Sequence, residues 1–259
     1  MTPGADSAEP APHRGHGRRL ETMTWLEAEP ILAADPVVVL PLGARTKEHG
    51  PHLPLNNDWL MAEYLAARVL VERPILLLPT LQYGFYPAFR EYPGSISLSL
   101  PTSRDMVLDI VRSLARHGPT RFYVLNTGIS TLKPLRACRD ILAREGVTLA
   151  FTHIGEAKRD AVQRWSEQAR GSHADEVETS MMLVMAPEVV RLDRAVRDDA
   201  EEARPGPLRR QAPVEDGVHS PSGSWGDPTL ATRQKGEAFV AALVAGILAD
   251  LDRLLESDG

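Results

Sequence analysis

Cysteine is almost absent from this chain: Cys138 is the only one, so no disulfide can form within a single copy. A chain of 259 residues does not need such a cross-link, because a single domain of this size buries roughly 70–75% of the surface that its unfolded chain exposes. Cys138 lies in the apolar stripe of an expected helix, which indicates a small core residue and not a nucleophile.

Long apolar runs and basic clusters are also missing. No stretch approaches the ~18 apolar residues that a membrane span needs. The net charge is -6 with acids and bases interspersed, which argues against a nucleic-acid-binding surface. We expect residues 1–20, rich in Pro, Gly and Ala, to form a disordered and dispensable tail ahead of one domain at 21–259. With little cysteine and no signal-peptide core, the sequence favours a cytoplasmic protein without membrane or nucleic-acid partners.

Short apolar runs alternate with helical patterns along the chain. The runs predict buried strands at residues 36–42, 75–79, 122–126 and 147–151. Helical patterns begin near residues 58, 103, 131, 157, 174 and 233, and residues 200–228 form an irregular excursion. This alternation predicts an α/β fold with a mainly parallel sheet sandwiched by helices. In such sheets the ligand lies beyond the carboxyl ends of the strands.

Two imidazoles and two carboxylates lie close together in the loop that follows the first expected strand. They are Glu48, His49, His52 and Asp58. Imidazole with carboxylate suits Zn²⁺, Mn²⁺ or Fe²⁺, and glycine and proline in the loop bend the backbone so that the side chains converge. The alternative is solvated loop histidines, with Asp58 acting only as a helix N-cap. Spacing alone leaves both interpretations open.

Four segments resemble signatures of the creatininase family and follow one another in the family's order. They are His49–Asp58 with its nine-residue spacing, Tyr92–Leu98, Gly171–Ser180 and Ser224–Gly236. On these segments the chain is identified as a member of that family from about residue 24 to residue 256. The resemblance implies a three-layer architecture and hydrolysis of a C–N bond in a small-molecule amide or cyclic amide. It also implies one or two Zn or Mn ions per chain, with Fe as an alternative, and a homo-oligomer, commonly a hexamer.

The resemblance also assigns roles to individual residues. His49 is expected to bind one metal, Asp58 to bridge two, and His173 to be a catalytic or substrate-polarising imidazole. Glu176 and Glu178 share the segment that supplies a carboxylate, and residues two apart on a helix point away from each other. We favour Glu178 as the metal ligand. Glu176 is the alternative ligand and a candidate catalytic group.

Two positions depart from the family pattern. Lys47 stands where members usually have a glutamate ligand, and Gly128 stands where a histidine usually binds metal. The stretch before His49 is one residue longer than usual, so we expect Glu48 to turn toward the metal and Lys47 to point away. The alternative is that Lys47 enters the site as a substitute cation, keeps the carboxylates ionised and polarises a carbonyl as a catalytic group.

Substrate contacts are expected from four further residues. They are His52, Tyr86, Asn126 and Trp225. Tyr86 belongs to an aromatic-rich loop, residues 83–92, that suits a flat or ring-shaped substrate. Packing at a subunit interface is the alternative explanation of this loop. Because two usual metal ligands are replaced, the alternative function is a scaffold that has lost one or both metals and binds a small molecule or a protein.

Overall fold

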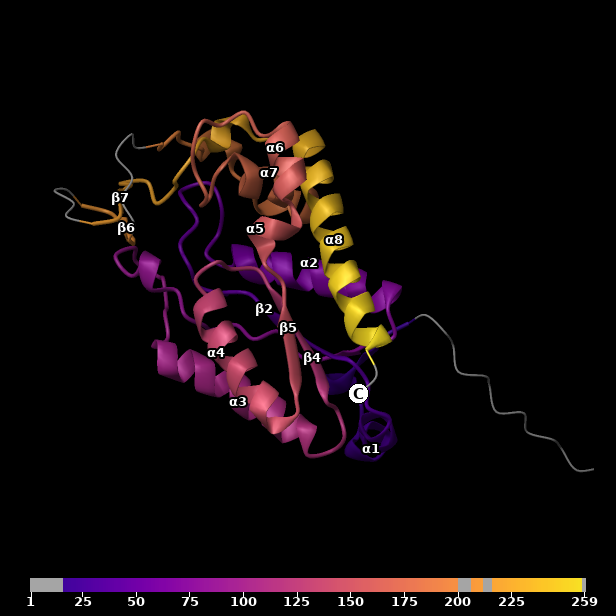
Figure 1. Ribbon diagram of the computed structural model, residues 1–259. Coiled ribbons are helices and arrows are strands. Elements are labelled where there is room, and N and C mark those ends of the chain that lie inside the picture. The colour runs from indigo at the N-terminus through magenta and orange to yellow at the C-terminus, as the bar shows by residue number, and fades with distance from the viewer. Residues whose placement is uncertain (1–15, 200–205, 212–215, 258–259) are drawn as a thin grey trace, which may run out of the picture.

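A five-stranded parallel sheet runs through the centre of the protein (Figure 1). The computed structural model describes residues 16–199, 206–211 and 216–257. The strands are β1 (Arg18–Arg19), β2 (Val38–Leu42), β3 (Leu76–Leu77), β4 (Arg121–Asn126) and β5 (Thr148–Phe151), in the order β1-β3-β2-β4-β5. β2, β3 and β5 lie within three of the apolar runs of the sequence, and β4 covers the fourth run with Arg121 in addition. The predicted α/β fold with a mainly parallel sheet is confirmed.

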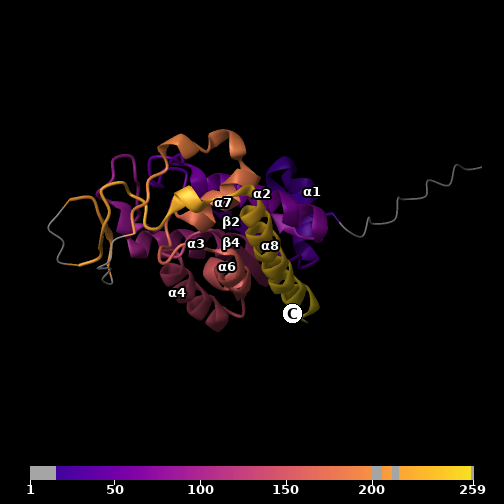
Figure 2. The same cartoon turned by 90° about the horizontal axis from the view of Figure 1, so that it is seen from above.

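Helices cover both faces of this sheet and make three layers (Figures 1 and 2). One face carries α2 (Asn57–Glu72), α5 (Ile154–Ala157), α6 (Arg159–Trp165), α7 (Glu176–Met185) and α8 (Arg233–Glu256). The other carries α1 (Trp25–Ala33), α3 (Leu100–Ala115) and α4 (Leu132–Leu142). Within the described ranges, no helix has both the length and the apolar character needed to cross a membrane.

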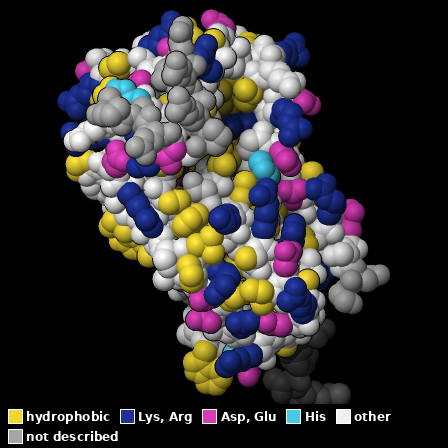
Figure 3. All heavy atoms as spheres, turned by 60° about the vertical axis from the view of Figure 1, so that its left-hand side comes forward, with side chains coloured by type: hydrophobic (Ala, Val, Ile, Leu, Met, Phe, Trp, Pro, Cys, Tyr) yellow, Lys and Arg dark blue, Asp and Glu magenta, His cyan; other side chains and the backbone are white. Residues whose placement is uncertain are grey.

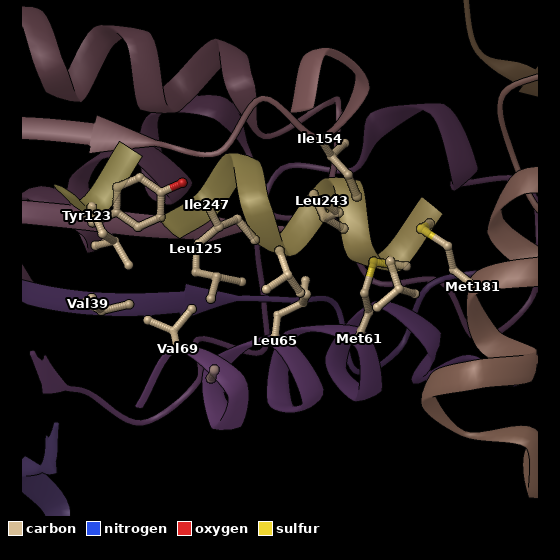
Figure 4. Packing of buried hydrophobic residues seen from close by; sticks show 14 of the residues in the cluster. Val39, Met61, Leu65, Val69, Tyr123, Leu125, Ile154, Met181, Leu243 and Ile247 are labelled. Atoms are coloured by element: carbon tan, nitrogen blue, oxygen red, sulfur yellow. The ribbon is translucent and has the colours of Figure 1, made fainter. Parts of the chain in front are cut away.

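The two cores follow from the alternation of side chains along the strands. Val39 and Leu125 point into the core beneath α2 and α8, where Figure 4 shows Val39 beside Val69 and Leu125 beside Ile247. Val38, the neighbour of Val39, points to the opposite face and packs in the core beneath α3 and α4. Successive residues of a strand face opposite sides, so a strand buried on both faces must be apolar throughout. This requirement explains the unbroken apolar run of β2.

Shorter elements connect the helices and strands of the sheet layers. They are the 3₁₀ turns η1 (Leu20–Thr22), η2 (Pro87–Phe89), η3 (Ala143–Glu145), η4 (Pro187–Val189), η5 (Leu192–Arg194) and η6 (Pro228–Leu230), and the strand pair β6 (Leu208–Arg209) and β7 (Val218–His219). The face in Figure 3 mixes basic and acidic side chains with scattered hydrophobic ones, without an extended field of one sign.

The N-terminal turn of α2 packs directly on the loop after β2. A Cβ atom added at Gly43 would lie 2.3 Å from the carbonyl oxygen of Asp58, so only glycine allows this approach. The helix buries Met61, Leu65 and Val69, which are four residues apart and share one face. This packing fixes the first turn of α2 against the loop and sets the position of Asp58.

The expected N-terminal tail lies only partly within the described residues. Arg18 and Arg19 form the edge strand β1, which pairs with Leu76 and Leu77 of β3. The amide of Gly17 also donates to the carbonyl oxygen of Leu70 at 2.7 Å. The end of the predicted tail therefore belongs to the domain, and the boundary at residue 20 is wrong. Residues 1–15 lie outside the described part.

We expect a chain that begins at Glu21 to be less stable than one that begins at His16. The shorter chain lacks β1 and the hydrogen bonds from Gly17 and from Arg18 to Ile75. At about 1 kcal/mol for each bond, and 2–4 °C per kcal/mol, Tm should fall by roughly 4–8 °C. Thermal denaturation followed by circular dichroism measures this difference. Equal Tm values would show that β1 contributes nothing to stability.

Candidate metal centre

Six charged or imidazole side chains converge beyond the carboxyl end of β2. They are Lys47, Glu48, His49, Asp58, His173 and Glu178. The first three come from the loop after β2, Asp58 from the first turn of α2, and the last two from the start of α7 and the segment before it. Their side chains are between 0 and 15% exposed. Five of the six are buried residues, so the cluster needs internal compensation of its charges.

His49 presents an unprotonated nitrogen to two carboxylates. Its Nδ1 lies 2.8 Å from the carbonyl oxygen of Lys47, which can only accept, so Nδ1 carries the hydrogen and donates. In the neutral ring Nε2 then holds a lone pair, 2.9 Å from Oδ1 of Asp58 and 3.5 Å from Oε1 of Glu178. Three electron-rich atoms facing one another repel unless a cation or a second proton joins them. This is the arrangement of a metal-binding imidazole fixed by a backbone carbonyl.

His173 is oriented in a similar way by Glu48. Its Nε2 donates to the backbone oxygen of Glu48 at 3.0 Å and to its Oε2 at 3.1 Å. The opposite nitrogen, Nδ1, lies 3.8 Å from Oε2 of Glu178. Burial lowers the pKa of His173, but the carboxylates of Glu48 and Glu178 together outweigh burial and the net shift is upward. The ring also packs against Phe89, with centroids 4.4 Å apart.

Glu178 is held in place through both of its oxygens. Oε2 accepts the amide of Ala174 at 2.8 Å, and Oε1 accepts Nδ2 of Asn57 at 3.1 Å. Ala174 has a φ of 45°, a left-handed conformation that is uncommon for alanine. Burial raises the pKa of Glu178, but the imidazoles of His49 and His173 outweigh burial and lower it. Glu178 is therefore an ionised carboxylate in a fixed orientation.

One ligand atom from each of His49, His173 and Glu178 lies within 4.8 Å of the others. Two imidazole nitrogens and a carboxylate oxygen suit Zn²⁺ or Mn²⁺, and three protein ligands leave a position for water. The three carboxylates and one ammonium of the cluster leave a formal charge of −2 when the imidazoles are neutral. A single divalent ion would neutralise this charge. The donor set therefore fits one metal ion.

Lys47 also lies inside the cluster, so the prediction that it points away is wrong. Its Nζ forms an ion pair with Oδ2 of Asp58 at 2.6 Å. Burial raises the pKa of Asp58, but the ammonium of Lys47 and the ring of His49 outweigh burial and lower it. Both oxygens of Asp58 are thus engaged, one by each neighbour. The alternative from the sequence, a lysine in the site, is the arrangement observed.

Glu48 faces His173 and not the pair of His49 and Asp58. Its Oε1 accepts the amide of Gly50, while Oε2 meets His173. A Cβ atom added at Gly223 would lie 2.2 Å from Oε1 of Glu48, so the chain passes closely over this carboxylate. Glu48 therefore orients an imidazole and lies outside the group of three candidate ligands.

Comparisons with known proteins match this architecture. The sequence model of the creatininase family, described as creatinine amidohydrolase, matches residues 21–251. The chain belongs to the creatininase family. Creatinine amidohydrolase of Pseudomonas putida is 30% identical over 247 residues, which cover 87% of this chain and 92% of that protein. Mycofactocin precursor peptide peptidase of Mycobacterium ulcerans (strain Agy99) is 31% identical over 219 residues, which cover 81% and 82%.

Solved creatininase structures share the fold. A crystal structure of creatinine amidohydrolase superposes with a TM-score of 0.75 at 28% identity, covering 93% of this chain and 98% of that one. A mutant creatininase of Zn–Zn type has a TM-score of 0.74 at 27% identity, with coverage of 92% and 98%. A Mn form has a TM-score of 0.73 at 27% identity, with coverage of 93% and 100%. The last two of these structures are therefore a zinc form and a manganese form of the same fold.

Glu176 and Glu178 are the two acids of α7 that the sequence offered as metal ligands, and Glu176 lies outside the metal cluster. Its carboxylate binds the ammonium of Lys235 and accepts the hydroxyl of Ser166 at 2.7 Å. It also accepts the amides of Glu167 and Gln168 at 2.9 and 2.8 Å. The carboxylate therefore connects α7, α8 and the segment before α7. Its placement does not support the catalytic role expected for it.

The four expected substrate-binding residues lie in different settings. His52 is buried and bonds Oγ1 of Thr179 at 2.8 Å, and burial lowers its pKa to about 4, so it is neutral at pH 7. Asn126 binds the backbone and side chains of its own loop, which gives it a structural role. Tyr86 is buried beside Lys47, with Nζ 5.6 Å from the ring centroid. Trp225 pairs through its backbone with His173, donating at 2.8 Å.

Two contacts of the site were not predicted from the sequence. Phe89 packs on His173, and Asn57 orients Glu178. The adjacency of Asn57 to Asp58 at the start of a helix was the available signal for a polar role. For Phe89 the sequence offered only its membership of an aromatic-rich loop.

Proposed function

We propose that this creatininase-family protein is a hydrolase of a non-peptide C–N bond in a small-molecule amide or cyclic amide, dependent on one Zn²⁺ or Mn²⁺ per chain. His49, His173 and Glu178 are the proposed ligands. One observation carries the proposal: each ligand is oriented by a second group. The carbonyl of Lys47 orients His49, and the carboxylate of Glu48 orients His173. The amide of Ala174 and the side chain of Asn57 orient Glu178. Outer partners of this kind are typical of metal-binding side chains. In keeping with the family, we propose a cytoplasmic homo-oligomer.

A bound ion would supply Lewis acidity and would lower the pKa of a water molecule beside it. The residues of the chain orient the ligands and transfer the protons. In the neutral rings of His49 and His173, the carbonyl of Lys47 and the carboxylate of Glu48 hold the hydrogen on one nitrogen and so fix the tautomer in which the other nitrogen is the ligand atom. Glu178, kept ionised by the two imidazoles, serves as a ligand, and Glu48, the carboxylate beside His173 that lies outside the three ligands, is the proposed carrier of the proton from water to the leaving nitrogen. Burial of the cluster strengthens these electrostatic effects.

The small-molecule class is favoured by the enclosure of the site. The side chains of the three proposed ligands are only 0, 8 and 15% exposed, which leaves little room for an extended peptide. The relatives named above include both a small-molecule amidohydrolase and a peptide peptidase at similar identity. Identity alone therefore does not choose between the two substrates.

Metal analysis tests the proposal directly. We expect about one Zn or Mn per chain after reconstitution, and less than about a tenth of an ion per chain in His49→Ala, because a three-ligand site loses one of its donors. The matched control is His117→Ala, an exposed histidine at the end of α3. Inductively coupled plasma mass spectrometry after gel filtration gives the count. Metal-free wild-type protein after growth in metal-replete medium would contradict the proposal.

A substrate panel tests the reaction class. The reconstituted protein would be incubated with creatinine, five- and six-membered cyclic amides, linear amides and short peptides, and the released amine measured. We expect hydrolysis among the small amides and its loss in His49→Ala. Cleavage of the peptides alone would place the protein with the peptidases of the family.

The second candidate function is a scaffold that binds a small molecule or a protein without hydrolysis. The ion pair of Lys47 with Asp58 favours this candidate, because a lysine occupies a place among the carboxylates. Gly128, which has no side chain to offer a metal, favours it too. Absence of metal together with retained binding of an amide by calorimetry would select the scaffold.

A further inference from the structure

The ammonium of Lys47 is enclosed on several sides. Asp58 contacts it at 2.6 Å, and among the residues that the structure describes Asp58 is its one ion-pair partner. The rings of Phe89 and Tyr86 face it, with centroids 4.8 and 5.6 Å from Nζ. Aromatic faces attract cations, and more strongly where water is excluded. With its side chain 6% exposed, Lys47 occupies a compartment shaped for a positive charge.

This compartment lies beside the proposed metal position and is chemically distinct from it. Asp58 touches both, because Oδ2 meets Lys47 while Oδ1 meets Nε2 of His49. Tyr86, which faces the ammonium, also lies beside Gly128, since its ring would be 3.6 Å from a Cβ atom added there. One carboxylate thus lies between two cation positions, of which one is filled by the chain itself.

We propose that Lys47 is a built-in cation that takes the place of a second divalent ion beside Asp58. The protein then works with one exchangeable metal and one fixed positive charge. A mutant creatininase of the same fold is of Zn–Zn type, which indicates that two zinc ions can occupy this fold. The charges agree: one divalent ion offsets the formal −2 of the cluster, whereas glutamate in place of Lys47 would make it −4 and call for two ions. The inference rests on the proposed function for the site of the first metal.

The test counts metal ions in charge-reversal variants. We expect Lys47→Glu to hold one more Mn²⁺ per chain than the wild type, since it gains a carboxylate beside Asp58. Lys47→Gln, which removes the ammonium without adding a ligand, should gain less. The matched control is Lys133→Glu, an exposed lysine on α4, which should gain none. Equilibrium dialysis against Mn²⁺, with circular dichroism to confirm folding, gives the difference.

The outcomes separate this inference from the proposed function. Wild-type protein without metal would refute the function, yet a gain of one ion in Lys47→Glu would still support the built-in cation. No gain in folded Lys47→Glu, or an equal gain in Lys133→Glu, would overturn it. If Lys47→Glu does not fold, the Lys47→Ala variant replaces it in the test. Added propylammonium has the same carbon chain and ammonium that Lys47→Ala removes, so it should restore most of the Tm lost in this variant. Sodium chloride at the same concentration should not restore it. Failure of that rescue would overturn the inference as well.

Discussion

Glu178→Gln is expected to weaken Mn²⁺ or Zn²⁺ binding by at least about 100-fold, since loss of even an outer partner of a metal ligand costs 10–100-fold. The variant keeps the shape of the side chain and an oxygen that can accept from Ala174 or Asn57. It removes the negative charge that faces His49 and His173. The rate of hydrolysis of any amide that the wild type cleaves should decrease in proportion to the metal content of the variant.

The same substitution should change stability only a little. The imidazoles of His49 and His173 favour the ionised carboxylate, so its removal costs some stability, and the reduced repulsion among the remaining acids together with the persisting hydrogen bonds offsets part of this cost. We expect Tm of the metal-free protein to stay within about 2–4 °C of the wild type, which corresponds to 1 kcal/mol in a domain of this size. Isothermal titration calorimetry measures the affinity, and Glu188→Gln, an exposed acid in η4, is the control. Wild-type affinity in Glu178→Gln would exclude this carboxylate from the metal site.

The choice between Glu178 and Glu176 illustrates what the sequence can predict about this site. Helical spacing showed that only one of the two could face the metals. The structure places Glu178 against His49 and His173, and turns Glu176 toward Lys235. The partner of Glu176 lies 59 residues away, and no local pattern indicates it. The sequence therefore predicted that the two acids diverge, but not what the second one binds.

Lys47 shows the limit of reasoning from loop length. The extra residue before His49 was interpreted as slack that turns Glu48 inward and Lys47 outward. In the structure both side chains enter the cluster, Glu48 toward His173 and Lys47 toward Asp58. A loop without regular structure has no fixed period, so neighbouring side chains need not alternate. Charge pairing across the loop, and not its length, accounts for the observed arrangement.

The fold was more predictable than the site because burial leaves a pattern. β2 is apolar throughout, and β4 carries an uninterrupted buried run at residues 122–125, since both faces of these strands are covered. β1 contains only Arg18 and Arg19 at the edge of the sheet, where polar residues are tolerated and no pattern marks a strand. It was therefore assigned to a tail.

Lys235→Met is expected to destabilise the protein by roughly 3–5 kcal/mol, because it leaves the carboxylate of Glu176 buried without its counter-charge. Glu176 is 0% exposed, and Lys235 is the one basic side chain paired with it in the described ranges. Burial raises the pKa of Glu176, but its bond to Lys235 and the other hydrogen bonds outweigh burial and lower it. At 2–4 °C per kcal/mol, Tm should fall by roughly 6–20 °C.

A double-mutant cycle distinguishes the ion pair from simple loss of packing. Glu176→Gln with Lys235→Met removes both charges, and the double variant should recover much of the stability lost in Lys235→Met, since paired removal of buried charges is often neutral. Arg233→Met breaks an exposed pair with Glu237 on the same helix and should cost only about 0.3–0.5 kcal/mol. Urea denaturation gives these values. A double variant no more stable than Lys235→Met would show that the methylene chain of Lys235, and not its charge, stabilises the contact between α7 and α8.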